Sequence, residues 1–305
     1  MLSNIIKNPE DFVVEEVIDD IFFKKYRRTG KGMEKIKGKY SLFIMKKRSM
    51  TTEQAIDKVS RQLNVDKNDI GYAGLKDKFA VTTQYITILG NKEGFSGKNL
   101  DLKKVSMTDK RIEVGNLKYN KFIITLHNVD NEKVIKRITK TKQIPNYFGF
   151  QRFGLDKKNH IVGKFTVKRQ YEKALDIINK YSSKKYSSIK DVPKKIVKFY
   201  INSYQSFLFN KMLLKSKKEI PIIGSGTKET KEVKKILKKE GIRTKDFSFS
   251  DLKIDCRGSL RNTKAKIYNL EYTKHRDKIR VSFRLEKGSY ATVFISCIIG
   301  EKPWK

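Results

Sequence analysis

The chain has 305 residues, 38% of them hydrophobic, and its 69 Lys and Arg outnumber its 33 Asp and Glu to give a net charge of +36. This length and apolar content suffice for a buried core and exclude global disorder, and no apolar run approaches the roughly 18 residues of a membrane span. The positive charge predicts a polyanionic partner. Because only 14 of the basic residues are Arg, the composition favours binding along a nucleic-acid backbone over recognition of base edges. A membrane surface is the weaker alternative, since the basic residues are spread over the whole chain.

The first part of the chain predicts mainly strands. Alternating or β-branched runs predict strands at 11–17, 41–45, 81–89 and 122–126. Thr51 and Gln54 have the spacing of a helix-capping box, and the apolar residues that follow fall on one helical face. A second helix is predicted to begin at Asp130 and to stop before Pro145. The basic, glycine-punctuated segment 24–39 is predicted to be a mobile loop.

The middle of the chain predicts helices instead. They are expected at 171–181 and 229–240, with a longer helix opened by Asp191 that has Pro193 in its first turn. The residues of this longer helix expected to face inward are Ile196, Val197, Tyr200, Tyr204, Phe207 and Leu208. After Arg257, strand character returns at 279–285 and 291–299. Strands at both ends around a helical block predict an α+β fold with an inserted helical domain.

Common metal, nucleotide and redox motifs are absent from the sequence. The three histidines have no metal-binding spacing, and the glycines form neither a P-loop nor a dinucleotide motif. Cys256 and Cys297 lie far apart, which excludes a CxxC motif and a disulfide framework, and both are interpreted as buried small hydrophobes. We therefore expect no metal and no cofactor, and a location in the reducing cytoplasm.

The densest polar cluster is GYAGLKDK at 71–78, which predicts a turn leading into a strand. Asp77 stands between Lys76 and Lys78, and their positive charges would keep its carboxylate ionised as a nucleophile or base. The glycines would let a substrate backbone come close. The alternative is a structural one, because Asp is also a common turn residue.

Three further clusters combine aromatic and polar side chains. NYFGFQRFG at 146–154 could stack and hydrogen-bond unpaired bases, or its aromatics could be core at a domain junction. SYQSFLFN at 203–210 lies on the long helix, where aromatics at helical spacing favour core. GSYAT at 288–292 is a turn with one exposed-looking aromatic and indicates little alone.

Together with PEDFVVEE at 9–16, these four clusters resemble the motifs of the TruD family of tRNA pseudouridine synthases, in that family's order along nearly the whole chain. The resemblance implies a mixed, largely antiparallel catalytic domain with an inserted, mainly helical domain. It places the catalytic domain at 1–154 and 258–305 and the inserted domain at 155–257.

The resemblance also implies an activity and a set of site residues. The activity is the isomerisation of uridine to pseudouridine in tRNA, at position 13, without a metal or cofactor. Asp77 is the implied catalytic acid. The implied substrate-binding residues are Phe12, Asn120, Phe153 and Tyr290 around the target base, with Lys76 or Arg152 pairing with Asp77 or a phosphate.

Two other functions stay open from the sequence. A non-catalytic RNA-binding protein or tRNA chaperone on the same fold would bind tRNA without base chemistry. A metal-dependent nuclease would need clustered carboxylates, but the acidic pairs 15–16 and 19–20 are interpreted as a solvated strand end.

Overall fold

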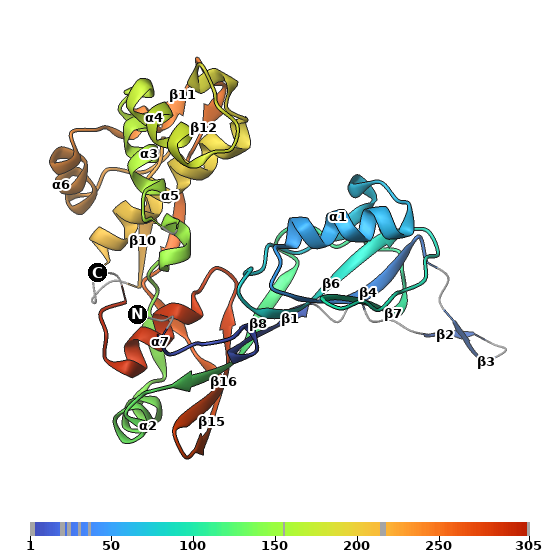
Figure 1. Cartoon of the computed structure of the whole chain (residues 1–305). Helices are drawn as coiled ribbons and strands as arrows, with labels where there is room; N and C mark the ends of the chain where they lie inside the picture. Colours follow the sequence, from blue (N-terminus) through green and yellow to red (C-terminus); the bar gives the residue numbers. More distant parts are fainter. Residues whose placement is uncertain are drawn as a thin grey trace. The chain divides into compact units, whose positions relative to one another are not determined.

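The computed structural model describes residues 4–18, 22, 26–29, 32–35, 38–154, 156–213 and 218–303 (Figure 1). The chain packs into two compact units. Unit 1 comprises Met1–Lys142 and Lys266–Gly288, and unit 2 comprises Gln143–Ala265 and Ser289–Lys305. Packing thus groups 143–154, 258–265 and 289–305 with the helical unit, whereas the resemblance places them in the catalytic domain. None of the helices in the described ranges is both long and apolar enough to cross a membrane.

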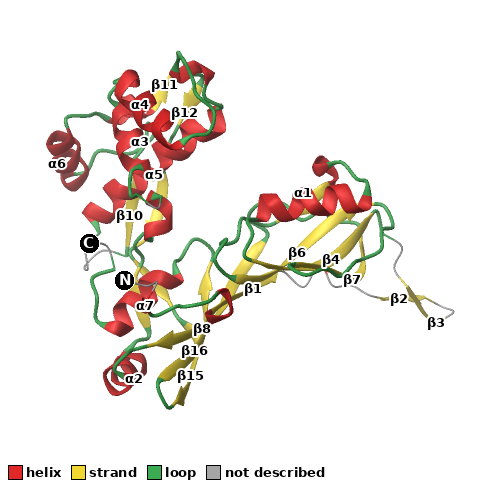
Figure 2. Cartoon of the chain, viewed as in Figure 1, coloured by secondary structure: helices red, strands yellow, loops and turns green. Residues whose placement is uncertain are grey.

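Unit 1 is built on an eight-stranded sheet in the order β15-β16-β8-β1-β6-β4-β7, with β5 paired to β6 (Figure 2). Only the pair β1–β6 is parallel, so the prediction of a mixed, largely antiparallel sheet is confirmed. The strands are β1 (Phe12–Ile18), β4 (Tyr40–Arg48), β5 (Ile70–Tyr72), β6 (Val81–Leu89), β7 (Leu100–Thr108), β8 (Leu117–His127), β15 (Tyr268–His275) and β16 (Lys278–Glu286).

Helix α1 (Thr52–Leu63) packs on one face of this sheet. The predicted capping box is present, since Thr51 Oγ1 accepts from Gln54 N and Gln54 Oε1 accepts from Thr51 N. The apolar face of α1 is buried with residues of β4, β6 and β7 in one cluster, whose removal from water is the main stabilising term of this layer. The second predicted helix is α2 (Asn131–Lys140), capped by Asp130.

The segment 24–39 was predicted to be a loop, and this is wrong for its central residues. β2 (Tyr26–Thr29) and β3 (Gly32–Lys35) form an antiparallel pair. Glycine and polar residues are as typical of a tight hairpin as of a loop, so composition alone could not separate the two. Apart from Gly38 and Lys39, the rest of this segment lies outside the described residues.

Unit 2 surrounds the long helix α5. Its helices are α3 (Asn159–Val167), α4 (Tyr171–Tyr181), α5 (Lys194–Met212), α6 (Lys231–Glu240) and α7 (Ala291–Ile299), and a short 3-10 helix, η5, spans Phe150–Phe153. Its strands form the pairs β10 (Glu219–Ile222) with β13 (Ser259–Asn262), β11 (Ser248–Phe249) with β12 (Ile254–Asp255), and β9 (Gln143–Pro145) with β14 (Lys264–Lys266). The helices predicted at 171–181 and 229–240 are confirmed, the second starting two residues later.

Two details of the long helix differ from the prediction. Asp191 does not open it: its carboxylate accepts from Ser188 N and closes a preceding 3-10 turn, and α5 begins after Pro193. Ile196 is exposed rather than inward, whereas Val197, Tyr204 and Leu208 are fully buried. Of the two cysteines, Cys256 is buried as predicted and Cys297 is only half-buried.

Residues 291–299 were predicted to be a strand, but they form α7. The run is apolar on nearly every side and is buried on nearly every side, so it carries no periodicity to separate helix from strand. Gly300, in the left-handed conformation, ends the helix.

Glu240, at the end of α6, is a buried carboxylate on which three side chains converge. Tyr204 Oη donates to it at 3.1 Å, and Lys164 and Lys211 reach it at 2.9 and 2.8 Å. Burial acts to raise the pKa of Glu240, but the hydrogen bonds from Lys211 and Lys164 lower it to about 2. Because the two lysines are partly exposed, solvent screening reduces their contribution.

We expect Glu240→Ala to destabilise the chain by about 2 kcal/mol, because it leaves Tyr204 and both ammonium groups without their acceptor. Since the folded pKa is depressed, this contribution is present above the ordinary pKa of Glu and is lost as pH falls from about 4.5 to about 2. Urea unfolding at pH 7 and pH 3 measures both effects. A loss of equal size at the two pH values would contradict the pairing.

Candidate active site

Asp77 lies on the loop that joins β5 to β6, as its glycine-rich sequence predicts. Hydrogen bonds from outside hold this loop in place. Thr52 Oγ1, at the start of α1, accepts from Lys76 N at 2.8 Å and donates to Gln84 Oε1 at 3.2 Å. Gln84 Nε2, on β6, donates to Gly74 O at 3.2 Å. The loop is therefore fixed to α1 and β6.

Lys47 is a buried cation directly beneath this loop. Its side chain belongs to β4, and only 1% of the residue is exposed. The ammonium donates to Asp77 O at 2.9 Å and to Met50 O at 2.7 Å. Burial lowers the pKa of Lys47 to about 8, so it still carries its charge at neutral pH. Lys47 thus holds the backbone of Asp77 and places a positive charge close to its carboxylate.

The electrostatic environment of Asp77 differs from the prediction. Burial raises the pKa of Asp77 above its usual value, and the charges of Lys47 and Lys76 lower it by a smaller amount. Lys78, which was expected to act with Lys76, is exposed and is not among the groups that shift this pKa. A buried carboxylate with a raised pKa is a stronger base than an ordinary Asp.

Lys76 forms a buried ion pair next to Asp77. Its Nζ lies 2.6 Å from Glu16 Oε1, and 5% of its side chain and 0% of that of Glu16 are exposed. Glu16 Oε2 also accepts from Tyr85 N at 3.1 Å. The interpretation of residues 15–16 as a solvated strand end is therefore wrong for Glu16, and the Lys76 ammonium is engaged by Glu16 rather than presented to a phosphate.

Asn120 meets the same ammonium from β8, where it pairs across the sheet with Glu16. Lys76 Nζ donates to Asn120 Oδ1 at 3.2 Å. Because an ammonium only donates, this contact fixes which end of the amide is the oxygen. No described residue accepts from Asn120 Nδ2. Two amide donors are thus left for an external carbonyl oxygen.

Hydrogen bonds to polar side chains elsewhere in unit 2 hold the segment 146–154 in place. Phe148 N donates to Asn210 Oδ1, and Asn210 Nδ2 donates back to Phe148 O, both at 2.9 Å. Asn146 Oδ1 accepts from Arg261 Nη2 at 2.7 Å. The aromatics of 203–210 are largely core, as their helical spacing favoured, and Asn210 is the residue of that motif that fixes the neighbouring one.

Arg152, on η5, is partly buried between polar and aromatic groups. Its Nε donates to Ser206 Oγ at 3.1 Å, and its guanidinium lies 5.8 Å from the ring centre of Phe148 and 5.7 Å from that of Phe199. It makes no ion pair within the described ranges. Its positive charge is therefore left for an external anion.

The three aromatic residues implied for base contact have different exposures. Phe12 and Phe153 are core residues, 5% and 3% exposed. Phe12 packs edge-to-face on Phe122, and Phe153 packs in the same way on His160. Tyr290, by contrast, is partly exposed at the start of α7.

Gly149 has a packing role beside Tyr290. A Cβ atom on Gly149 would lie 2.7 Å from Tyr290 Cδ1, so only glycine lets this ring settle against the 146–154 segment. The tyrosine ring also packs edge-to-face on Phe148. Its position within unit 2 is thereby fixed.

Unit 1 therefore brings together Asp77, Lys76 and Asn120, with Phe12 buried in the same unit, while Arg152, Phe153 and Tyr290 belong to unit 2. Sequence reasoning missed Lys47 and Thr52 and misinterpreted Glu16. The burial of Lys47 could have been predicted from the sequence. Alternate residues of a strand face the same side, and Lys47 follows the buried Phe43 and Met45 at that spacing along β4. Thr52 had none, since its contacts are to residues distant in the sequence.

Comparison with known proteins gives a consistent result. A family profile described as tRNA pseudouridine synthase D (TruD) matches residues 2–188 and 218–298. A probable tRNA pseudouridine synthase D of Nanoarchaeum equitans is 31% identical over 382 aligned residues, which cover 97% of this chain and 98% of the relative. Another, of Methanococcus maripaludis, is 29% identical over 360 residues, with 94% and 92% covered.

A solved structure shares the fold. The crystal structure described as that of a "Putative tRNA pseudouridine synthase D (TruD)" from Methanosarcina mazei aligns with a TM-score of 0.67 at 21% identity, covering 98% of this chain and 94% of that one.

Proposed function

This chain belongs to the tRNA pseudouridine synthase D (TruD) family and is an isomerase that converts uridine to pseudouridine in tRNA, and we propose that Asp77 is its catalytic residue. The observation that carries this proposal is the half-buried Asp77 carboxylate, with its raised pKa, on a loop held by Lys47, Thr52 and Gln84. No observation favours the non-catalytic RNA-binding alternative.

The conversion of uridine to pseudouridine needs one reactive carboxylate of this kind. The N1–C1′ bond of the target uridine breaks, the uracil turns, and C5 bonds to C1′. The hydrogen on C5 leaves to solvent, and N1 takes up a proton. Asp77 would act on the sugar, either by attacking C1′ or by removing the C2′ proton, and its raised pKa suits both roles.

The remaining site residues are proposed to hold the flipped-out base. Removing a base from the helical stack costs a few kcal/mol, which stacking on an aromatic ring at about 1–3 kcal/mol offsets in part. Tyr290 is the best candidate for stacking because its ring is partly exposed. Asn120 Nδ2 would donate to a uracil carbonyl, in an orientation set by Lys76. Phe12 and Phe153 are each buried in the core of their own unit, so their rings are less suited to stacking on a base.

We propose uridine 13 of the tRNA as the target. The experiment that tests this position measures tritium release from tRNA transcribed with 5-³H-uridine, since attachment at C5 displaces that hydrogen. We expect release from the natural transcript and none from a transcript in which uridine 13 is replaced by cytidine. Release of equal size from both transcripts would place the target at another uridine. A cytoplasmic location and a catalytic domain at 1–154 and 258–305 belong to the same proposal.

Lys47 is proposed as a positioning residue, and Lys47→Met tests it. We expect tritium release to fall about 100-fold, because the Asp77 backbone loses its donor and the carboxylate shifts. Because the Lys47 charge lowers the pKa of Asp77, its loss should move the acid limb of the pH–rate profile to higher pH. Lys46→Met is the matched control, since Lys46 is exposed on the other face of β4. An acid limb at the same pH in both variants would contradict this role.

A further inference from the structure

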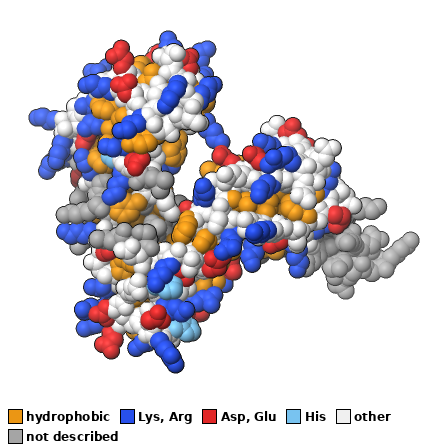
Figure 3. Space-filling view, viewed as in Figure 1, with side chains coloured by type: hydrophobic (Ala, Val, Ile, Leu, Met, Phe, Trp, Pro, Cys, Tyr) orange, Lys and Arg blue, Asp and Glu red, His pale blue; other side chains and the backbone are white. Residues whose placement is uncertain are grey.

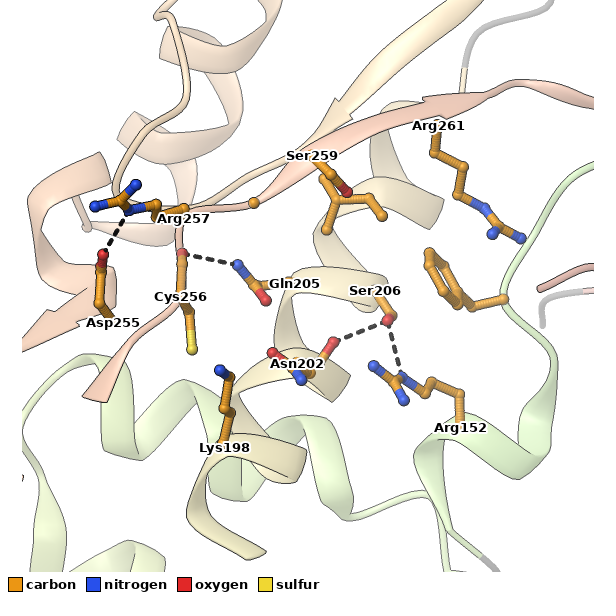
Figure 4. A pocket seen from close by; sticks show the side chains of 13 residues that line it. Arg152, Lys198, Asn202, Gln205, Ser206, Asp255, Cys256, Arg257, Ser259 and Arg261 are labelled. Carbon is orange, nitrogen blue, oxygen red and sulfur yellow. Dashed lines mark hydrogen bonds and ion pairs between the residues drawn. The ribbon is translucent and has the colours of Figure 1, made fainter. Parts of the chain in front are cut away.

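A cavity of about 690 Å³ lies wholly within unit 2, beside α5. We call it the α5 pocket. In Figure 4, Lys198 and Asn202 from α5 and Arg152 from η5 line one side, and Ser259 and Arg261 from β13 line the other. Phe148, Ile222 and Cys256 supply an apolar wall. Such a volume suits a ligand of about the size of a nucleotide rather than a bare ion.

The α5 pocket carries an excess of positive charge. Asp255 is its one acidic residue among those that the structure describes, and Arg257 Nε reaches its carboxylate at 3.1 Å. Lys198 makes no hydrogen bond or ion pair within the described ranges. Arg261 lies 4.1 Å from the ring centre of Phe148 and donates to Asn146. Within the described residues, Arg152 and Lys198 thus have no carboxylate partner, an arrangement that attracts an anion.

The α5 pocket offers donors of the kinds that bind phosphate. Arg152 uses Nε for Ser206, and neither of its Nη groups has a partner in the described part of the chain. Two adjacent N–H groups of this kind bind two phosphate oxygens at once, while the Lys198 ammonium supplies a mobile point charge. The side chain of Arg257 is 85% exposed, so the pocket continues to the surface. An anion on a long chain can therefore enter it and leave again.

We propose that the α5 pocket binds a phosphodiester group of the substrate tRNA, with Arg152 and Lys198 on the phosphate and the neighbouring nucleoside against the Phe148 wall. The proposal rests on the proposed function for the identity of the RNA. It assigns to unit 2 a specific anchoring point for the RNA in addition to its general positive charge, which Figure 3 shows spread over the visible surface.

Filter binding of tRNA at several salt concentrations tests the proposal with two matched variants. Lys198→Ala removes the exposed pocket lysine, and Lys234→Ala removes an exposed lysine in the middle of α6, outside the pocket. We expect Lys198→Ala to raise the dissociation constant about five-fold and to reduce the log–log salt slope by about 0.7–1, as for one lost phosphate contact. Lys234→Ala should change neither. Equal affinities and slopes for the two variants would overturn the proposal.

Asn202→Asp is the second variant, because it puts a carboxylate into the pocket without changing the side chain's size. We expect tRNA binding about ten-fold weaker at low salt, with an unchanged melting temperature. If Asn202→Asp abolishes binding of uridine 5′-monophosphate but leaves tRNA affinity at the wild-type value, the pocket serves a free nucleotide and the proposal fails.

Tritium release by the wild type separates this proposal from the proposed function. Release by the wild type, with equal tRNA affinity in Lys198→Ala and Lys234→Ala, would overturn the pocket assignment alone. No release by the wild type, with weaker binding in Lys198→Ala only, would overturn the catalytic proposal and support an RNA site in the pocket.

Discussion

Asp77→Asn should abolish tritium release from 5-³H-uridine tRNA while leaving the dissociation constant for tRNA within about three-fold of wild type. Asparagine has nearly the same shape as aspartate but can neither attack C1′ nor accept the C2′ proton, so the chemical step loses its reactive group while the loop stays in place. The Lys47 contact is to the backbone oxygen of residue 77 and survives the substitution.

The matched control for Asp77→Asn is Asp69→Asn, just before β5, which removes a carboxylate from the same unit without touching the loop contacts. It should retain wild-type turnover. Measurable product from Asp77→Asn under single-turnover conditions would remove Asp77 from the catalytic role, and a simultaneous loss of tRNA binding would reduce it to a binding residue.

The second large effect is expected from Lys76→Met. Glu16 would keep a buried negative charge without its cation, and breaking a buried pair in this way costs about 3–5 kcal/mol. Lys78→Met, at the exposed neighbouring lysine, should change the stability by less than about 0.5 kcal/mol. The urea midpoint of each variant measures the difference.

A double variant separates stability from activity at this site. Lys76→Met combined with Glu16→Gln removes the unpaired charge and keeps an acceptor for Tyr85 N, so most of the stability should return. Tritium release should stay about ten-fold below wild type, because Asn120 has lost the donor that orients its amide. If the double variant regains full activity, Lys76 has only a structural role.

The sequence predicts much of unit 1 because local patterns and the tertiary fold agree there. Alternation predicted 279–285 within β16, and Thr51 with Gln54 predicted the start of α1. In unit 2, the strand prediction for 291–299 was wrong, because burial on nearly all sides removes the periodicity that separates a helix from a strand.

For the candidate active site, the sequence predicted the reactive residue but not the residues around it. The motif around Asp77 identified the reactive group, but the groups that set its pKa could not be read from its neighbours in sequence. Lys78 is adjacent yet exposed, whereas Lys47 is thirty residues away and donates to the Asp77 backbone. Likewise the partner of Lys76 is Glu16, which a distant strand brings beside it. Such pairings follow from strand order, and strand order is a property of the whole sheet.

The strand order of unit 1 has a consequence for biosynthesis. β8 is the antiparallel neighbour of both β1 and β16, but β16 leaves the ribosome only after the whole segment 143–265 of unit 2. About 150 residues separate the end of β8 from β16, which at about 5–20 residues per second amounts to roughly 8–30 s of elongation. Throughout that interval the nascent β8 has unpaired hydrogen-bonding groups along one edge, a template for pairing with other chains. Translation speed through 143–265 therefore sets how long the newborn chain is exposed to aggregation.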